Sequence, residues 1–269
     1  MQMDDHEVAA RWHGNADVWS RHVRAGYDTY RDHLNNPAFF ALIGDIEGMV
    51  ALDAGCGEGY NTRLLARRGA RMIGVDIAEG MIEQARAAEA SEPLGIHYEV
   101  ASMTDMPMFA NGQFDAVFST MALMDCADYA AAVTEICRVL KLGGMLAFSI
   151  LHPCFVFHLE AREWTRDESG AICGLKLGDY FRRGIGEDRW CFGSAPDRDE
   201  VEPFTVLYFD RTLADYINPL CACGFTIEAI EEPYPSDEAC EAEPRLRKHR
   251  LLPISFMVRA RKATTNGCP

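Results

Sequence analysis

The stretch Leu52-Asp-Ala-Gly-Cys-Gly-Glu-Gly-Tyr60 joins the end of an apolar, strand-like segment to three closely spaced glycines. Residues 49–53 have the character of a short buried strand, and residues 60–68 that of a helix. Glycines at positions 55, 57 and 59 let a ligand approach backbone N–H groups that side chains would otherwise shield. The stretch therefore predicts a strand, a ligand-binding loop and a helix in succession.

A regular alternation of strands and helices follows this stretch. Such alternation is typical of a parallel sheet with helices on both faces, an α/β fold. The expected strands and helices, in chain order, are strands at 49–53, 71–76, 96–100, 114–119, 145–151, 225–230 and 254–260, and helices at 60–68, 78–90, 126–140 and 212–223. The third of these helices is expected to end before Gly143-Gly144.

The remaining segments lack this alternation. Residues 1–46 carry aromatic side chains in a helical pattern and predict an N-terminal helical cap. Residues 152–205 are rich in glycine, arginine, aspartate and aromatic residues without a clear period, so we interpret them as an insertion that covers the substrate, with one further strand at 204–209. The expected core comprises residues 47–151 and 206–262, and residues 263–269 form a frayed tail.

Composition excludes several classes of function. With 26 Lys and Arg against 41 Asp and Glu, the formal net charge is −15, which disfavours nucleic acids and anionic membranes as partners. The first residues are acidic where a signal peptide would be basic, and no apolar run approaches the roughly 20 residues of a membrane span. The 10 cysteines show no framework of pairs and no metal-ligand spacing, so we expect reduced thiols, no metal and a cytoplasmic location.

An acid stands where a nucleotide ribose would need one. Asp76 ends the second expected strand, about twenty residues past the glycine loop, where a carboxylate accepts hydrogen bonds from both ribose hydroxyls. The dinucleotide-binding fingerprint of dehydrogenases has G-x-G-x-x-G, with a glycine where this chain has Tyr60. The missing glycine makes a nucleotide-dependent oxidoreductase the weaker alternative.

Four segments together resemble the class I S-adenosylmethionine-dependent methyltransferases. They are Asp53 with the glycine loop, Gly74-Val-Asp-Ile77, Phe114-Asp-Ala-Val-Phe-Ser-Thr-Met121 and Arg138-Val-Leu-Lys-Leu-Gly-Gly-Met145. The resemblance covers residues 47–151 and 212–262 and is nearest to small-molecule methyltransferases, including quinone-modifying ones. It implies a Rossmann-like, seven-stranded, mostly parallel sheet with an antiparallel last strand. It also implies methyl transfer from S-adenosylmethionine, with S-adenosylhomocysteine as product.

The resemblance implies a set of donor-binding residues. The loop would wrap the methionine portion, the acid at the second strand would hold the ribose, and neighbouring apolar side chains would cover the adenine. The positions concerned are Gly55, Cys56, Gly57, Gly59, Asn61, Asp76, Ile77, Met81, Ser102, Met103, Ser119 and Thr120.

Three of the donor contacts have alternatives. Asn61 either bonds the donor carboxylate or caps the helix that it opens. Ser102 stands where relatives often carry an acid for the adenine amino group, unless Asp105 reaches in. Tyr27 or Tyr30 closes over the donor as a lid, or else packs as part of an apolar helix face.

Two residues are candidates for a general base. His152 follows the fifth strand and titrates near neutrality, and its alternative is a loop histidine hydrogen-bonded to backbone. Asp125 follows the fourth strand, and its alternative, which we favour, is an N-cap of a helix that begins near Cys126. A base contributes only if the acceptor is a hydroxyl, thiol or protonated amine.

The acceptor is expected to be a small organic molecule, methylated at O, N, S or C. Trp164, Arg182, Arg183 and Trp190 in the insertion would suit a planar or anionic acceptor. The basic run at residues 245–250 is interpreted as a solvated turn, with an anion site as the less favoured alternative. A protein that binds the donor without transferring a methyl group is the non-enzyme alternative. A monomer or a homodimer is expected.

Overall fold

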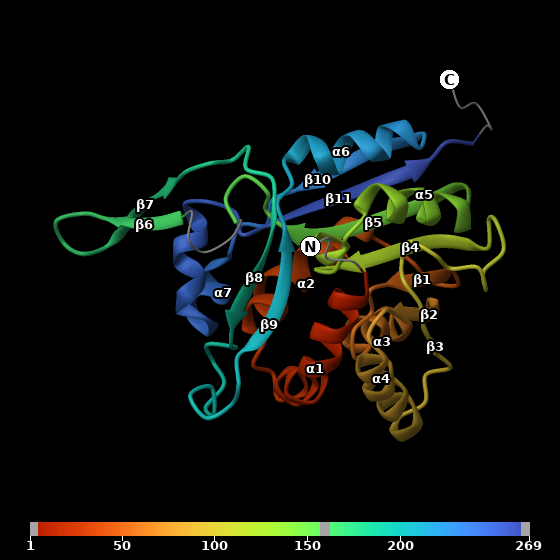
Figure 1. Ribbon diagram of the computed structural model, residues 1–269, viewed down its shortest axis with the longest axis horizontal. Coiled ribbons are helices and arrows are strands. Elements are labelled where there is room, and N and C mark those ends of the chain that lie inside the picture. The colour runs from red at the N-terminus through yellow and green to blue at the C-terminus, as the bar shows by residue number, and fades with distance from the viewer. Residues whose placement is uncertain (1–4, 157–161, 265–269) are drawn as a thin grey trace.

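The computed structural model describes residues 5–156 and 162–264 (Figure 1). Seven strands form the main sheet, in the order β10-β11-β5-β4-β1-β2-β3. Their bounds are Val50–Ala54 (β1), Arg71–Asp76 (β2), His97–Val100 (β3), Phe114–Thr120 (β4), Leu140–Leu151 (β5), Phe225–Glu231 (β10) and Ser255–Lys262 (β11). Strands β1 to β5 pair in parallel, whereas β11 is antiparallel to both β5 and β10. The expected α/β fold, with its antiparallel last strand, is confirmed.

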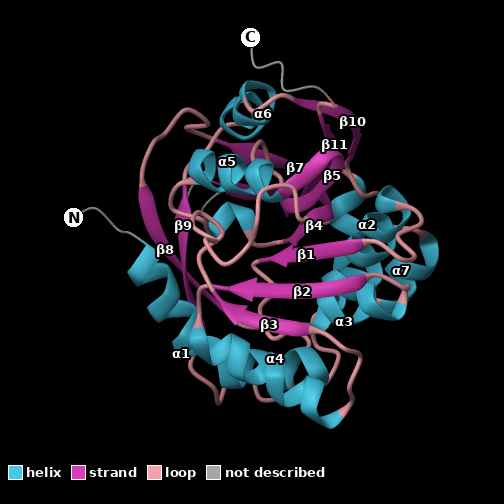
Figure 2. Ribbon diagram, turned by 90° about the vertical axis from the view of Figure 1, so that its right-hand side faces the viewer, coloured by secondary structure: helices cyan, strands magenta, loops and turns pink. Residues whose placement is uncertain are grey.

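Helices cover both faces of this sheet. Their bounds are Asp5–Arg24 (α1), Asn36–Ile43 (α2), Tyr60–Arg67 (α3), Glu79–Ser91 (α4), Tyr129–Val139 (α5), Leu213–Ala222 (α6) and Asp237–Ala242 (α7). Helices α5 and α6 pack on one face, and α2, α3 and α4 pack on the other (Figure 2). Two buried apolar clusters, one for each face, therefore hold the sheet between the helices.

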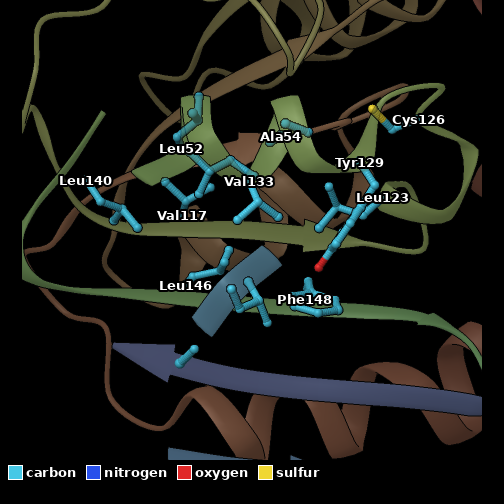
Figure 3. Packing of buried hydrophobic residues seen from close by; sticks show 14 of the residues in the cluster. Leu52, Ala54, Val117, Leu123, Cys126, Tyr129, Val133, Leu140, Leu146 and Phe148 are labelled. Carbon is cyan, nitrogen blue, oxygen red and sulfur yellow. The ribbon is translucent and has the colours of Figure 1, made fainter. Parts of the chain in front are cut away.

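Alternation along the central strands supplies both clusters. In β4, Phe114 and Val117 belong to the cluster under α5, while Ala116 and Phe118 belong to the opposite cluster. Figure 3 shows Val117 facing Val133 of α5. Because successive side chains of a strand point to opposite faces, an unbroken apolar strand has to be covered on both sides. The apolar run from Ala116 to Phe118 in β4 is thus covered on both faces.

The expected helix at residues 126–140 and the strand after it have different bounds in the structure. Asp128 caps α5, since its Oδ1 accepts a hydrogen bond of 2.9 Å from the backbone N–H of Ala131. The helix accordingly begins at Tyr129. Strand β5 already begins at Leu140, and Gly143, with φ of +73°, lies within a shift of its register against β4.

The insertion contains regular structure that its sequence does not suggest. Strands β6 (Arg162–Arg166) and β7 (Ile172–Leu177) form an antiparallel hairpin, which projects from the body of the molecule (Figure 1). Strand β8 (Ile185–Trp190) pairs antiparallel with β9 (Phe204–Phe209), the strand expected at 204–209. Most residues of β8 are charged or glycine. Its sequence therefore lacks the apolar residue at every second position that marks a strand.

The carboxyl ends of the central strands lie beneath the cap and the insertion. Figure 2 shows β1 and β2 pointing toward the side where α1, β8 and β9 lie. Helix α1 packs against α4 and β9. Within residues 5–156 and 162–264, no helix combines the length and the apolar composition that crossing a membrane requires. Of the tail expected at 263–269, residues 265–269 lie outside the described range.

Candidate functional site

A cavity of about 670 Å³ lies at the carboxyl ends of β1, β2 and β4. Helix α1, residues 27–31, strands β8 and β9 and the 3-10 helix Pro244–Arg250 form its other walls. The volume falls within the roughly 300–1,000 Å³ range of small-molecule sites. Ligands of open α/β sheets bind at this edge of the sheet.

The glycine loop borders the cavity through backbone that is bare of side chains. Gly55, Cys56 and Gly57 line it. Gly57 has φ of +54°, and a Cβ added there would meet no atom within 4 Å, so its backbone lies open. Gly59 is not among the described lining residues; it is the N-cap of α3, and a Cβ there would come within 2.5 Å of the Tyr98 hydroxyl. Close packing therefore explains this last glycine.

The Asp76 carboxylate lies at the cavity wall and is bound by backbone. Its Oδ2 accepts from the N–H of Gly57, and its Oδ1 from that of Ala78, both at 2.9 Å. Burial raises the pKa of Asp76, and backbone hydrogen bonds oppose this shift. Each oxygen keeps a lone pair for a ligand hydroxyl. Ile77 and Met81 line the cavity beside it.

An acid approaches Ser102 from an unexpected part of the chain. Asp5, in the first turn of α1, accepts hydrogen bonds from the Ser102 hydroxyl at 2.6 Å and from the Thr104 hydroxyl at 3.1 Å. Asp5, Ser102 and Met103 line the cavity, whereas Asp105 forms a backbone bridge with Ser102 and is absent from the described lining. No spacing rule relates Asp5 to a loop 97 residues away, so the sequence offered no signal for it.

Asn61 does not cap α3, whose N-cap is Gly59. Its Nδ2 donates to the Thr120 hydroxyl at 2.9 Å, and its Oδ1 accepts from Asn36 Nδ2 at 2.8 Å. All three side chains line the cavity. Ser119, by contrast, is buried and donates to the Ala54 carbonyl at 2.7 Å, away from the cavity wall. The end of β4 is thus tied to both the helix after the loop and the cap.

Met121, directly after β4, has an uncommon backbone conformation. Its φ is +54°, which few non-glycine residues adopt. Hydrogen bonds from its N–H to the Ser149 carbonyl, at 2.8 Å, and hydroxyl, at 3.2 Å, hold this turn. Met121 also lines the cavity. Strained backbone held by its surroundings is common at functional sites.

Tyr27 and Tyr30 both border the cavity, as does Trp19. Trp19 donates through Nε1 to buried Glu58, the acid of the glycine loop, at 3.0 Å. The Tyr27 ring contacts His22 edge to face, with centroids 5.6 Å apart. The aromatic residues of the cap therefore pack together and also face the cavity, so the two readings offered for Tyr27 are compatible.

Arg31 is a lining residue that the sequence did not single out. Its guanidinium lies 3.7 Å above the centre of the Tyr60 ring, and Nε donates to Asp32 at 2.9 Å. Nη2 is buried and has no partner among the described residues. Burial of Asp28 next to it raises the pKa of that carboxyl, although the guanidinium opposes the shift. Arg31 can therefore still bind an anion in the cavity.

Asp125 is not a helix cap, because Asp128 caps α5. It lines the cavity instead, next to Met124 and Cys126. Burial raises its pKa to about 8, while Arg211 and a hydrogen bond with Trp12 oppose this shift. Arg211 itself donates to three carbonyls of the same loop, at residues 124, 126 and 127. The loop is therefore held firmly, with an uncharged carboxyl at neutral pH.

The hydrogen bonds of His152 are those expected of a loop histidine, the alternative to a general base. Its Nδ1 accepts from the N–H of Cys154 at 3.1 Å, and its Nε2 lies 2.7 Å from Glu232 Oε1. The side chain is buried, which lowers its pKa, and it is absent from the described lining of the cavity. With both nitrogens engaged, the ring positions the chain after β5.

The interpretation of residues 245–250 as a solvated turn is wrong. They lie in a 3-10 helix whose Leu246 and His249 side chains are buried, while Arg245 and Lys248 line the cavity. Pro244 at the start of this helix and the capping carboxylate of Glu243 fix its place. Only two residues of this run, Leu246 and His249, are buried. The basic residues around them obscure this packed face in the sequence.

The four insertion residues proposed to face an acceptor divide into two kinds. Trp190 lines the cavity, whereas Trp164 is absent from the described lining and has Lys248 Nζ 5.3 Å from its ring centre. Arg182 and Arg183 approach Asp210 at 3.5 Å and Asp215 at 3.0 Å, respectively. These two arginines are absent from the described lining residues.

The nine cysteines in the described residues are free thiols. In the same part of the chain, no group of three or more His, Cys, Asp or Glu side chains is arranged to hold an ion.

Comparison with known proteins places this geometry in a family. Residues 52–148 match the family model described as a methyltransferase domain. An uncharacterized protein of Haemophilus influenzae is 27% identical over 223 residues, which cover 80% of this chain and 82% of that protein. The malonyl-[acyl-carrier protein] O-methyltransferase of Serratia marcescens is 36% identical over 104 residues, but the match spans only 39% of either chain.

Solved structures agree with the sequence matches. The crystal structure of an S-adenosylmethionine-dependent methyltransferase from Mesorhizobium loti has a TM-score of 0.69 and 28% identity, covering 84% of this chain and 96% of that one. The glycine loop, the acid after β2 and the strand order thus occur with the matched domain. Residues 52–148 thus match a methyltransferase domain, within a chain that has the fold of a solved S-adenosylmethionine-dependent methyltransferase.

Proposed function

We propose that this enzyme methylates a small organic acceptor bound beside the donor under the insertion. One observation carries the proposal: a single cavity is bounded by the glycine loop and Asp76 on one side and by Trp190, Arg245 and Lys248 on the other. A protein that only sensed the donor would not require this second part. The match to malonyl-[acyl-carrier protein] methyltransferases covers too little of the chain to name the acceptor.

The residues present fit S-adenosylmethionine. The open backbone of Gly57 accommodates the methionine portion, and Nη2 of Arg31, which has no partner among the described residues, suits its carboxylate. Asp76 offers oxygens to the ribose hydroxyls, with Ile77 and Met81 along the base. This assignment adds Arg31 to the residues expected from the sequence.

Asp5 completes the donor site at the adenine edge. Ser102, after β3, stands where a residue would accept a hydrogen bond from the adenine amino group. Its hydroxyl already donates to Asp5. Asp5 borders the cavity beside Ser102. Its carboxylate can therefore accept a hydrogen bond from the adenine amino group in place of Ser102. The amino-terminal helix thereby becomes part of the donor site.

The reaction needs mainly orientation and a dry cavity. S-adenosylmethionine supplies an electrophilic methyl group when it is bound. Orientation in such reactions contributes up to about 7–11 kcal/mol, and Tyr27, Trp19 and Trp190 exclude water from the cavity. Asp125 is the lining carboxyl that could take a proton from a hydroxyl, thiol or ammonium acceptor, an effect of about 10²–10⁴-fold. Because its pKa is about 8, the rate of such a reaction would rise with pH up to that value.

Calorimetric titration tests the donor site directly. We expect S-adenosylmethionine and S-adenosylhomocysteine to bind, NADH not to bind, and Asp76→Ala to weaken both adenosyl ligands. Binding of NADH alone would overturn the proposal. A screen of small acceptors for release of S-adenosylhomocysteine then tests transfer itself, and donor binding without any turnover would support the sensor alternative.

A further inference from the structure

The acceptor part of the cavity has a cationic end. Arg162, at the start of β6, and Arg245 and Lys248, on the 3-10 helix, all line it. These residues come from segments more than eighty positions apart, so the fold gathers them. The formal charge of the whole chain is −15, which makes such a gathering unusual for this protein.

The two arginines and the lysine differ in their partners. Arg245 donates to Glu243 through Nε at 2.8 Å and through Nη2 at 2.6 Å, and this pair holds the pKa of Glu243 at about 2. Arg162 has Asp188 as its neighbouring opposite charge. Lys248 Nζ instead faces the Trp164 ring, and in the described part of the chain it has no carboxylate within ion-pair distance.

The surroundings of Lys248 carry an excess of positive charge. Its side chain is half-buried, and after burial, Arg162 and then Arg245 lower its pKa. The adjacent His249 is buried, and its Nε2 has no partner among the described residues. Burial and then the charge of Lys248 lower the pKa of His249 to about 4, so this ring is neutral at physiological pH. An anion here would meet a cation that no carboxylate among the described residues neutralises.

A second cavity continues this cationic end. Its volume is about 540 Å³, and Arg245 and Lys248 border both cavities. The other lining residues are three further arginines and three apolar residues: Arg166, Arg247, Arg250, Ile172, Pro244 and Leu251. Arg250 donates to Asp237 at 2.6 Å, while Arg247 is exposed. The cationic surface therefore extends from the acceptor cavity to its neighbour.

We propose that Lys248, with Arg245, binds a carboxylate or phosphate group of the methyl acceptor. The acceptor would then be an anionic organic molecule whose reacting atom lies near the donor and whose anionic group lies where the two cavities adjoin. Hydrogen bonds to an ionised group are about twice as strong as neutral ones, and a half-buried ammonium gains most from such a partner. This inference rests on the proposed function of the same cavity.

Titration with simple anions tests the inference without knowledge of the acceptor. The protein is first saturated with S-adenosylhomocysteine and then titrated with pyrophosphate or with malonate at low ionic strength. We expect at least one of them to bind, and Lys248→Gln to weaken it about ten-fold or more, the size of a lost charged hydrogen bond. Whichever anion binds more tightly identifies the group as phosphate or carboxylate.

Matched variants separate this outcome from misfolding. Lys176→Gln removes the same charge from an exposed lysine 4.0 Å from Glu163, and it should leave anion binding unchanged. Lys248→Arg should retain binding within about three-fold. Both Lys248 variants should bind S-adenosylhomocysteine as the unaltered protein does.

Two results would overturn the inference. One is S-adenosylhomocysteine binding without any anion binding to the unaltered protein, and the other is equal anion affinity in Lys248→Gln. Absence of S-adenosylhomocysteine binding would instead count against the proposed function itself. The two failures are therefore distinct.

Discussion

The Asp125 carboxyl makes folding stability depend on pH in a way that can be isolated. Its pKa is about 8 in the folded protein and 3.8 as an ordinary aspartate, mainly because burial disfavours the charged form. Between these two pH values the folded state binds more protons than the unfolded chain. Stability is therefore fully present below pH 3.8 and is lost as the pH rises toward 8.

The structure sets the size of this effect. At 1.36 kcal/mol for each pH unit, the interval from 3.8 to 8 corresponds to at most about 6 kcal/mol. The Asp125 side chain is only partly buried, so we take about half, ~3 kcal/mol, because solvent screens such a group. Asp125→Asn keeps the shape and the contact with Trp12 but removes the ionisation.

Urea unfolding at pH 5, 7 and 9 measures the difference. We expect the stability of Asp125→Asn relative to the unaltered protein to rise by about 2 kcal/mol between pH 5 and pH 9 and to level off above that. Asp128→Asn, a change at the exposed α5 cap where asparagine is also favoured, is the control and should change stability little at any pH. A difference for Asp125→Asn that stays constant within 0.5 kcal/mol from pH 5 to pH 9 would refute the reasoning.

Three further predictions concern buried or unpaired polar groups. Tyr98→Phe should stabilise the protein by about 1 kcal/mol in urea unfolding, since the Tyr98 hydroxyl is buried without a partner among the described residues; a loss of stability would contradict this. Arg31→Met should lower the affinity for S-adenosylhomocysteine about ten-fold in calorimetry while sparing 5′-methylthioadenosine, which lacks the amino-acid end. Asp5→Ala should reduce a preference for S-adenosylhomocysteine over its inosine analogue, and an unchanged preference would place the adenine amino group elsewhere.

Much of the fold could be predicted because its signals are local. Each core strand is a short apolar run next to a glycine or a helix, and the antiparallel last strand is the one feature that required the resemblance to a family. The insertion escaped prediction because β8 alternates charged and glycine residues, and its pairing with β9 is decided by contacts across the chain. The start of α5 was expected near Cys126, after Asp125, whereas Asp128 caps the helix and sets its start at Tyr129.

The amino-acid sequence by itself determined the side of the cavity that the glycine loop and Asp76 form. Strand β1, the glycine turn and Asp76 lie within one contiguous stretch, so their geometry follows from parallel-strand connectivity alone. Tertiary structure decided the rest. It brought Asp5 to Ser102, left one nitrogen of Arg31 without a partner among the described residues and placed Lys248 against the same cavity. These side chains belong to segments that are distant along the chain. The cap and the insertion bring them together by packing over the sheet, and no local sequence pattern indicates that packing.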